Sequence, residues 1–226
     1  MPTIHIFGDS HAHFTFQGLG SHIKRYEFLS HHQYSTTMHR VGRDQHIINC
    51  QPDTIDKTND IIIMVYGEID CRCHIQRQID KGRELNEIAQ TLVDAYITSI
   101  LQYGFHNVIV VAVPPPVSKN EFEKRNGPIQ HHLPFVGTDE ERVLYTTKVN
   151  HLLEEQCARN GLTFSNPFHS YISENGTMDF SKTDGLNHVG NNTNAIEEIK
   201  LCIKKLISAS TDLQSNSRLP NQSNID

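Results

Sequence analysis

The sequence lacks the segments that would place the chain in a membrane or on a secretion route. No run of about 18 apolar residues occurs in its 226 residues, which argues against a transmembrane helix. The opening residues, MPTIHIFGDSH, also lack a basic segment followed by a long apolar stretch, the pattern of a secretory signal. We therefore expect a cytoplasmic protein with no membrane partner.

Clusters of basic residues are missing as well. The chain carries 20 Lys and Arg against 26 Asp and Glu, with a net charge of -6 and a pI near 6.2. Its lysines and arginines are scattered, whereas a surface that binds a nucleic-acid backbone needs a basic patch. We expect no nucleic-acid partner and a small-molecule or glycan substrate, while the oligomeric state stays open.

Cysteine is too sparse to form a disulfide framework. The five cysteines are an odd number spread along the chain, and in a cytosol-like compartment we expect reduced thiols: Cys50, Cys71, Cys73, Cys157 and Cys202. The composition is 37% hydrophobic and 20% charged, which is within the globular range. We expect one domain over residues 1–207 and a flexible, Ser-, Asn- and Gln-rich tail over 208–226.

Strand and helix patterns alternate along the chain. Residues 60–66 and 107–113 are nearly continuous apolar runs, which are typical of strands buried on both faces. Shorter strands are expected at 3–7 and 162–164, and a weaker one at 45–49. Amphipathic helices are expected over 84–103, from Thr138 onward and over 192–207. This alternation predicts an α/β fold with a parallel sheet of about five strands between two helix layers.

Polar residues gather where the predicted strands end. In a parallel sheet these carboxyl ends share one edge, and ligands bind there. Ser10 follows the first strand on a glycine turn, the string GEIDCRCH (67–74) follows the strand at 60–66, and Asp184 and His188 precede the last helix. A serine, a histidine and an acid are the parts of a nucleophilic triad.

These blocks resemble the SGNH (GDSL-like) hydrolases. The resemblance covers residues 3–207 and depends on GDSH after the first strand, Gly-x-x-Asp after a central strand, PPP after the next, and an Asp/His pair before the last helix. It implies a flavodoxin-like three-layer α/β/α fold. It also implies hydrolysis or transfer of acyl groups, often acetyl groups on carbohydrates, without a cofactor or metal.

The resemblance assigns roles to individual residues. Ser10 would be the nucleophile, His188 the general base and Asp184 the acid that orients it. Gly42, in the loop HRVGRD, would donate its backbone N–H to the oxyanion. Four polar residues are expected to shape the site or bind substrate around the nucleophile, namely His11, Glu68, Asp70 and His74.

Two features depart from the family pattern. The family's Gly-x-Asn-Asp block reads Gly67-Glu68-Ile69-Asp70 here, and isoleucine cannot donate the hydrogen bond that the Asn gives to the oxyanion. Arg72 is a candidate replacement, and pairing of Arg72 with Glu68 or Asp70 is the alternative. The family's Asp-x-x-His spacing is also one residue longer here.

We interpret the sequence as that of a serine esterase that removes acyl groups, and three other interpretations compete with it. Acyl transfer to a sugar would use the same acyl-serine, and a degenerate glycan- or partner-binding module would need no turnover. Asp9-x-His11 resembles the first motif of metal-dependent phosphoesterases, which is the third alternative. The further motifs that such enzymes need are incomplete in this sequence. The polar segment 114–138 is expected to form part of the substrate rim.

Overall fold

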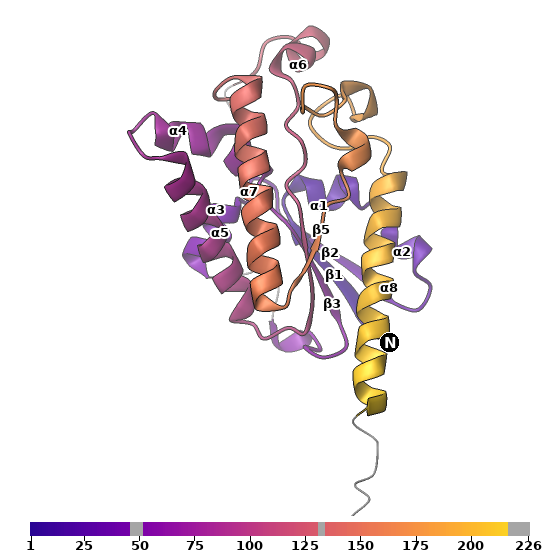
Figure 1. The fold of residues 1–226 in the computed structure, drawn as a ribbon. Coiled ribbons are helices and arrows are strands. Elements are labelled where there is room, and N and C mark those ends of the chain that lie inside the picture. Colours follow the sequence, from indigo (N-terminus) through magenta and orange to yellow (C-terminus); the bar gives the residue numbers. More distant parts are fainter. Residues whose placement is uncertain (46–51, 131–133, 217–226) are drawn as a thin grey trace, which may run out of the picture.

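The computed structural model describes residues 1–45, 52–130 and 134–216. Its core is a five-stranded, fully parallel sheet with the strand order β2-β1-β3-β4-β5, which is the flavodoxin-like order. This confirms the predicted α/β fold class (Figure 1). The strands are β1 (Thr3–Gly8), β2 (Glu27–His32), β3 (Ile61–Val65), β4 (Asn107–Val111) and β5 (Thr163–Ser165).

Helices cover both faces of the sheet, because successive side chains of each strand point to opposite sides. In β3, Ile62 and Met64 pack into one apolar cluster, whereas Ile61 and Ile63 belong to the other. The first cluster includes residues of α3, α5 and α7, and the second includes residues of α1, α2 and α8 (Figure 1). The two helix layers pack on the faces of the sheet, and the loops that follow the strands lie at its carboxyl edge.

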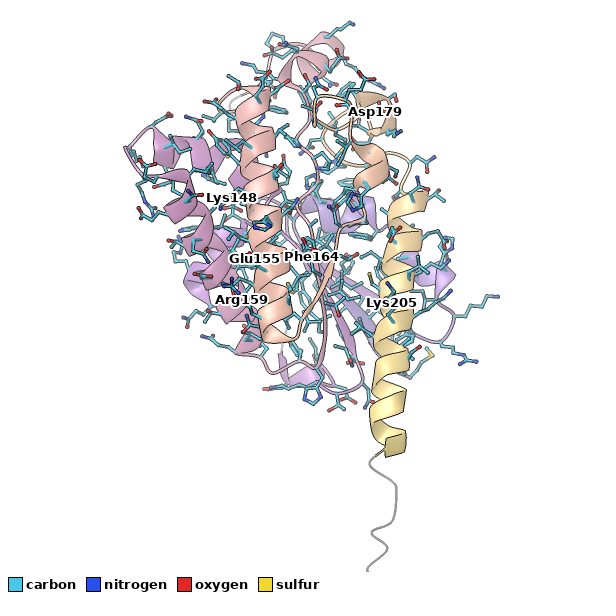
Figure 2. The ribbon with its side chains drawn as sticks, viewed as in Figure 1. Lys148, Glu155, Arg159, Phe164, Asp179 and Lys205 are labelled. Atoms are coloured by element: carbon cyan, nitrogen blue, oxygen red, sulfur yellow. The ribbon has the colours of Figure 1, made fainter. Side chains whose placement is uncertain are left out.

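The helices begin and end at residues that their capping chemistry explains. Thr138 caps α7 with the expected capping box, in which Glu141 bonds back to the Thr138 amide. Charged side chains on the outer side of this helix are labelled in Figure 2. The helices are α1 (Ser10–Thr15), α2 (Leu19–His22), α3 (Met38–Asp44), α4 (Ile75–Ile79), α5 (Leu85–Leu101), α6 (Lys119–Asn126), α7 (Asp139–Asn160) and α8 (Thr193–Asn216). None of these described helices is long and apolar enough to cross a bilayer.

Several elements differ from the sequence-based expectations, because the short helices α1, α2, α3, α4 and α6 were not predicted. β2 was not predicted, because it is an edge strand whose residues EFLSHH are partly or largely exposed. At the weak strand expected over 45–49, Gln45 instead ends α3 in a left-handed conformation, and 46–49 lie outside the described residues. Helix α8 continues past the expected end at Ile207 to Asn216.

The proline run after β4 is tied to α7 by one side chain. Asn150 accepts a hydrogen bond from the Val113 amide at 2.7 Å and donates one to the Val113 carbonyl at 2.9 Å. Val113 is buried, so water cannot replace these bonds at low cost. This contact fixes the direction in which the chain leaves the sheet edge toward α6.

Replacing Asn150 with Ala should therefore destabilise the protein by about 2 kcal/mol, because two buried backbone groups lose their partners. Urea unfolding would measure the change. Asn160→Ala, at an exposed position of the same helix, is the matched control and should stay within about 0.5 kcal/mol of the wild type. An Asn150 variant as stable as this control would contradict the assignment.

Candidate active site

Ser10 lies where β1 passes into α1, at the carboxyl edge of the sheet. Asp9 is the N-cap of α1, and its carboxylate accepts a hydrogen bond from the His11 amide at 2.8 Å. Ser10 is the first residue of this helix, so its N–H has no carbonyl within the helix to bond. The turn thus presents a hydroxyl and a free amide side by side.

A chain of two hydrogen bonds connects Ser10 to an acid. His188 Nε2 lies 2.9 Å from Ser10 Oγ, and His188 Nδ1 lies 2.8 Å from Asp184 Oδ2. Both distances are within the range expected between a nucleophile, its base and the group that orients the base. The three residues predicted as a triad are therefore brought together in the order hydroxyl, imidazole, carboxylate.

The loop that carries Asp184 and His188 accommodates the extra residue between them. Thr183 and Val189 form an antiparallel bridge, and the Asp184 amide donates to the His188 carbonyl at 3.0 Å. Between them Gly185 takes a φ of 89°, a conformation that favours glycine. This tight turn brings the Asp184 carboxylate back to the His188 ring in spite of the longer spacing.

Asp184 is held in its charged form. Burial would raise the pKa of its carboxyl, but hydrogen bonds from His188 and from the Leu186 amide outweigh burial and lower it. Oδ1 accepts the Leu186 amide at 2.8 Å, while Oδ2 faces His188. An ionised acid in this place fixes the imidazole tautomer and stabilises an imidazolium.

His11 is buried directly beside His188, with ring centroids 4.8 Å apart. Its Nδ1 lies 3.0 Å from the Asp9 carboxylate and its Nε2 lies 3.0 Å from the Asn187 carbonyl. Burial would lower the pKa of His11, but the charges of Asp9 and Glu68 and the two hydrogen bonds raise it to about 9. Both ring nitrogens are engaged, one with the Asp9 carboxylate and one with the Asn187 carbonyl.

Arg72 is paired with Glu68, which was one of its two expected roles. Arg72 Nε lies 2.6 Å from Glu68 Oε1, and each side chain is only 7% exposed. Arg72 also donates to the Pro134 carbonyl at 2.8 Å. Burial would raise the pKa of Glu68, but the charges of Arg72, His11 and His188 lower it. The guanidinium thus takes part in a buried ion pair, and a contact with an oxyanion stays a prediction.

Gly42, which is expected to donate to the oxyanion, lies within α3. It is buried inside α3, where an α-helix directs each amide to the carbonyl four residues earlier. A Cβ at Gly42 would lie 2.8 Å from Ala95 Cβ and 2.9 Å from the Ala95 carbonyl carbon, both in α5. Its lack of a side chain lets α3 and α5 pack closely, and its role as an oxyanion donor stays a prediction.

Asp70 and His74 are both in the π-helical turn that follows β3, but their surroundings differ. Asp70 is buried and accepts hydrogen bonds from the amides of Met38 at 2.7 Å and His39 at 3.3 Å, so it caps α3. Burial raises the pKa of Asp70 to about 7 although these amides oppose the shift. His74 is exposed and, together with Asp70, lines a pocket to which none of the triad residues contributes.

The segment 114–138 is attached to the site from two sides. Asn126 at the end of α6 donates to the Gly185 carbonyl at 2.8 Å, next to Asp184. The Val136 amide donates to the Arg72 carbonyl at 3.0 Å. No sequence signal pointed to Asn126 or Val136, because these contacts join loops far apart in the chain. The expected substrate rim thus lies against the triad loop, and its contact with substrate remains a prediction.

The residues that the metal-enzyme alternative would use have other surroundings in the structure. Asp9 and His11 form an ion pair, and Cys71 and Cys73 are buried thiols whose pKa values are raised by burial. Within residues 1–45, 52–130 and 134–216, no group of three or more His, Cys, Asp or Glu side chains is arranged to hold a metal ion.

Comparison with solved structures finds proteins with a similar fold. A GDSL-like lipase from Bacteroides thetaiotaomicron superposes with a TM-score of 0.59 at 11% identity, covering 90% of this chain and 88% of the lipase. The esterase EstA from a Pseudoalteromonas species gives 0.54 at 11% identity, covering 92% and 100%. An aryl esterase of M. smegmatis gives 0.50 at 17% identity, covering 93% and 99%.

At these identities the likeness shows a shared three-layer α/β fold and no more. No protein-family model and no curated protein sequence matches the chain. The fold is therefore defined by the sheet and its layers, and the site is defined by its own geometry.

Gly42→Ala tests how closely α3 packs against α5. The added methyl group would meet the α5 backbone, so we expect a loss of about 1–3 kcal/mol in the free energy of unfolding. Fluorophosphonate labelling of Ser10, measured on the folded variant, should keep its wild-type rate. An unchanged free energy of unfolding would contradict the close packing of Gly42 against the α5 backbone.

His11 should remain protonated well above neutral pH. NMR titration of its ring nitrogens should show deprotonation near pH 9, and Asp9→Asn should lower that midpoint. Because the folded pKa is raised, the protonated ring stabilises the fold fully below about pH 6.5. That contribution, on the order of 3 kcal/mol, is lost as the pH rises through 9.

The His11→Gln variant assigns the resonance and should show a flatter fall in stability between pH 6.5 and 9. Loss of the ring proton near pH 6.5 would contradict the hydrogen bonds that we assign from His11 to the Asp9 carboxylate and the Asn187 carbonyl.

Proposed function

We propose that this protein is a serine esterase that removes ester-linked acyl groups, with acetyl groups on a carbohydrate as its substrate class. The observation that carries the proposal is the hydrogen-bonded chain from Ser10 Oγ through the His188 ring to the Asp184 carboxylate. A serine hydroxyl within 2.9 Å of an oriented imidazole is poised to lose its proton as it attacks a carbonyl carbon.

The proposed reaction has two steps. In the first, Ser10 Oγ bonds to the acyl carbon while His188 Nε2 takes the hydroxyl proton and then gives it to the leaving alcohol. In the second, His188 removes a proton from water, the hydroxide attacks the acyl-serine, and the proton returns to Ser10 as the acid departs. Asp184 stays ionised throughout and stabilises the imidazolium in each step.

The oxyanion receives one clear donor, the amide of Ser10 at the start of α1. Ile69 has no donor, Arg72 is paired with Glu68, and Gly42 is packed inside α3. Since one missing donor costs roughly 100- to 1000-fold in rate, we expect slow turnover of unactivated esters. Reagents that react readily with an activated serine should still modify Ser10.

The acyl group and the alcohol come from the family resemblance, whose members often act on acetylated carbohydrates. The same acyl-serine could pass its acetyl group to a sugar hydroxyl instead of water, and the triad geometry serves both reactions. The proposal is the hydrolysis, and acetyl transfer is the outcome that product analysis with an added sugar acceptor would distinguish.

Fluorophosphonate labelling tests the activated serine directly. The similar esterase EstA was solved inhibited by monoethylphosphonate, so an organophosphorus reagent suits this fold. We expect a single adduct on Ser10, located by peptide mass mapping, and none in Ser10→Ala. His188→Gln and Asp184→Asn should each slow labelling by roughly 100-fold or more, because the hydroxyl loses its base or the base loses its tautomer.

Ser21→Ala is the matched control, since the Ser21 hydroxyl is exposed and bonds only to the Gly18 carbonyl in its own turn. It should label at the wild-type rate. Absence of an adduct on a well-folded wild-type protein would overturn the esterase proposal and favour a binding module that keeps the triad geometry without turnover.

A further inference from the structure

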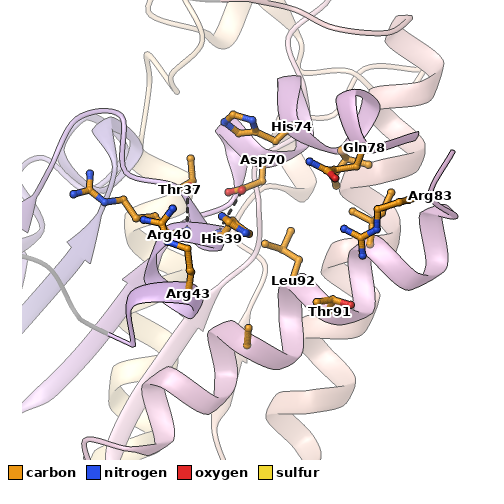
Figure 3. Close-up of a pocket in the computed structure, with 13 residues that line it drawn as sticks. Thr37, His39, Arg40, Arg43, Asp70, His74, Gln78, Arg83, Thr91 and Leu92 are labelled. Carbon is orange, nitrogen blue, oxygen red and sulfur yellow. Dashed lines mark hydrogen bonds between the residues drawn. The ribbon is translucent and has the colours of Figure 1, made fainter. Parts of the chain in front are cut away.

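A pocket of about 660 Å³ lies between α3, the turn after β3 and α5 (Figure 3). Ser10, Asp184 and His188 do not line it, so it is distinct from the triad. Its volume is within the ~300–1,000 Å³ typical of sites for small molecules. We call it the α3–α5 pocket.

Arginines reach the α3–α5 pocket from two sides. Arg40 and Arg43 come from α3, and Arg83 lies across the pocket at the start of α5 (Figure 3). Their side chains are 48%, 61% and 38% exposed, so their guanidinium groups are open to a ligand. Their partners, Asp44 and Glu87, do not line the pocket, and such solvent-exposed ion pairs exchange easily for another anion.

The remaining lining does little to cancel this positive charge. Among the described residues that line it, Asp70 is the only carboxylate, and both of its oxygens face the amides of Met38 and His39. Its raised pKa, about 7, also leaves it partly neutral near physiological pH.

The lining of the pocket also contains apolar side chains and hydroxyl groups. Ile75, Ile88 and Leu92 form the apolar part, while Thr37 and Thr91 supply hydroxyls. A largely apolar cavity with a few convergent polar groups is the usual form of a small-molecule site. The planar, always charged guanidinium groups match phosphate and carboxylate oxygens, with which arginine forms paired hydrogen bonds.

We propose that the α3–α5 pocket binds a small anionic ligand, a sugar or nucleoside ring with a phosphate or carboxylate group. The ring would lie against Leu92 and its neighbours, and the anionic group would bind between the arginines. This site is additional to the esterase site and does not depend on the esterase proposal.

Isothermal titration calorimetry on the full chain tests the proposal with two probes. Uridine diphosphate represents the phosphate source and glucuronate the carboxylate source, with uridine and glucose as their uncharged counterparts. We expect at least one charged probe to bind, its counterpart to bind far more weakly, and the affinity to fall as salt is added.

The Arg40→Gln/Arg43→Gln double variant should weaken that binding by roughly tenfold or more, because two charge-assisted contacts are lost. Arg159→Gln is the matched control; this arginine is labelled on α7 in Figure 2, is 64% exposed, and does not line the pocket. It should bind the probe as the wild type does. Thermal unfolding of each variant establishes that it is folded.

Two results would overturn the proposal: no binding of either charged probe to the wild type, or equal weakening by the α3 variant and by Arg159→Gln. Ser10→Ala should bind the charged probe as the wild type does. Probe binding without labelling of wild-type Ser10 would overturn the esterase proposal and support the ligand site. Labelling of Ser10 without probe binding would support the esterase proposal and overturn the ligand site.

Discussion

A buried, protonated histidine holds the two halves of the candidate site together. His11 bonds to Asp9 in its own turn and to the carbonyl of Asn187, which is 176 residues away in the sequence. The first bond fixes the turn that presents Ser10, and the second fixes the loop that carries Asp184 and His188. The 2.9 Å contact between Ser10 and His188 depends on this connection.

Charge balance explains why these polar residues can be buried beneath the site. Asp9 faces His11 and Glu68 faces Arg72, so each buried charge has an opposite partner. An unpaired charge in such a place would cost several kcal/mol. The same pairing engages the charged groups of His11, Glu68 and Arg72 with partners inside the protein.

Sequence patterns predicted the parts of this structure that are governed by local chemistry. The apolar runs at 60–66 and 107–113 became β3 and β4 because both faces of those strands are buried. The Thr138 cap of α7 could be predicted because a capping box depends on four consecutive residues only. The edge strand β2 was missed because its exposed faces leave no alternation of apolar and polar residues to read.

Features that depend on distant packing could not be read from the sequence. The position of Gly42 follows from the approach of α5 to α3, and a glycine in the string HRVGRD gives no sign of it. Arg72 had two open roles, and only the fold decides between them by placing Glu68 at 2.6 Å. The longer Asp184–His188 spacing raised a question that Gly185 answers through its backbone conformation.

The central claim is that Ser10 forms a covalent acyl intermediate. Brief mixing with p-nitrophenyl acetate, an acid quench and peptide mass mapping would detect that intermediate before water removes it. The account predicts one added acetyl group on Ser10 in the wild type and none in Ser10→Ala. Release of p-nitrophenol with no acetyl group on Ser10 at any quench time, or no reaction of a folded protein, would contradict it.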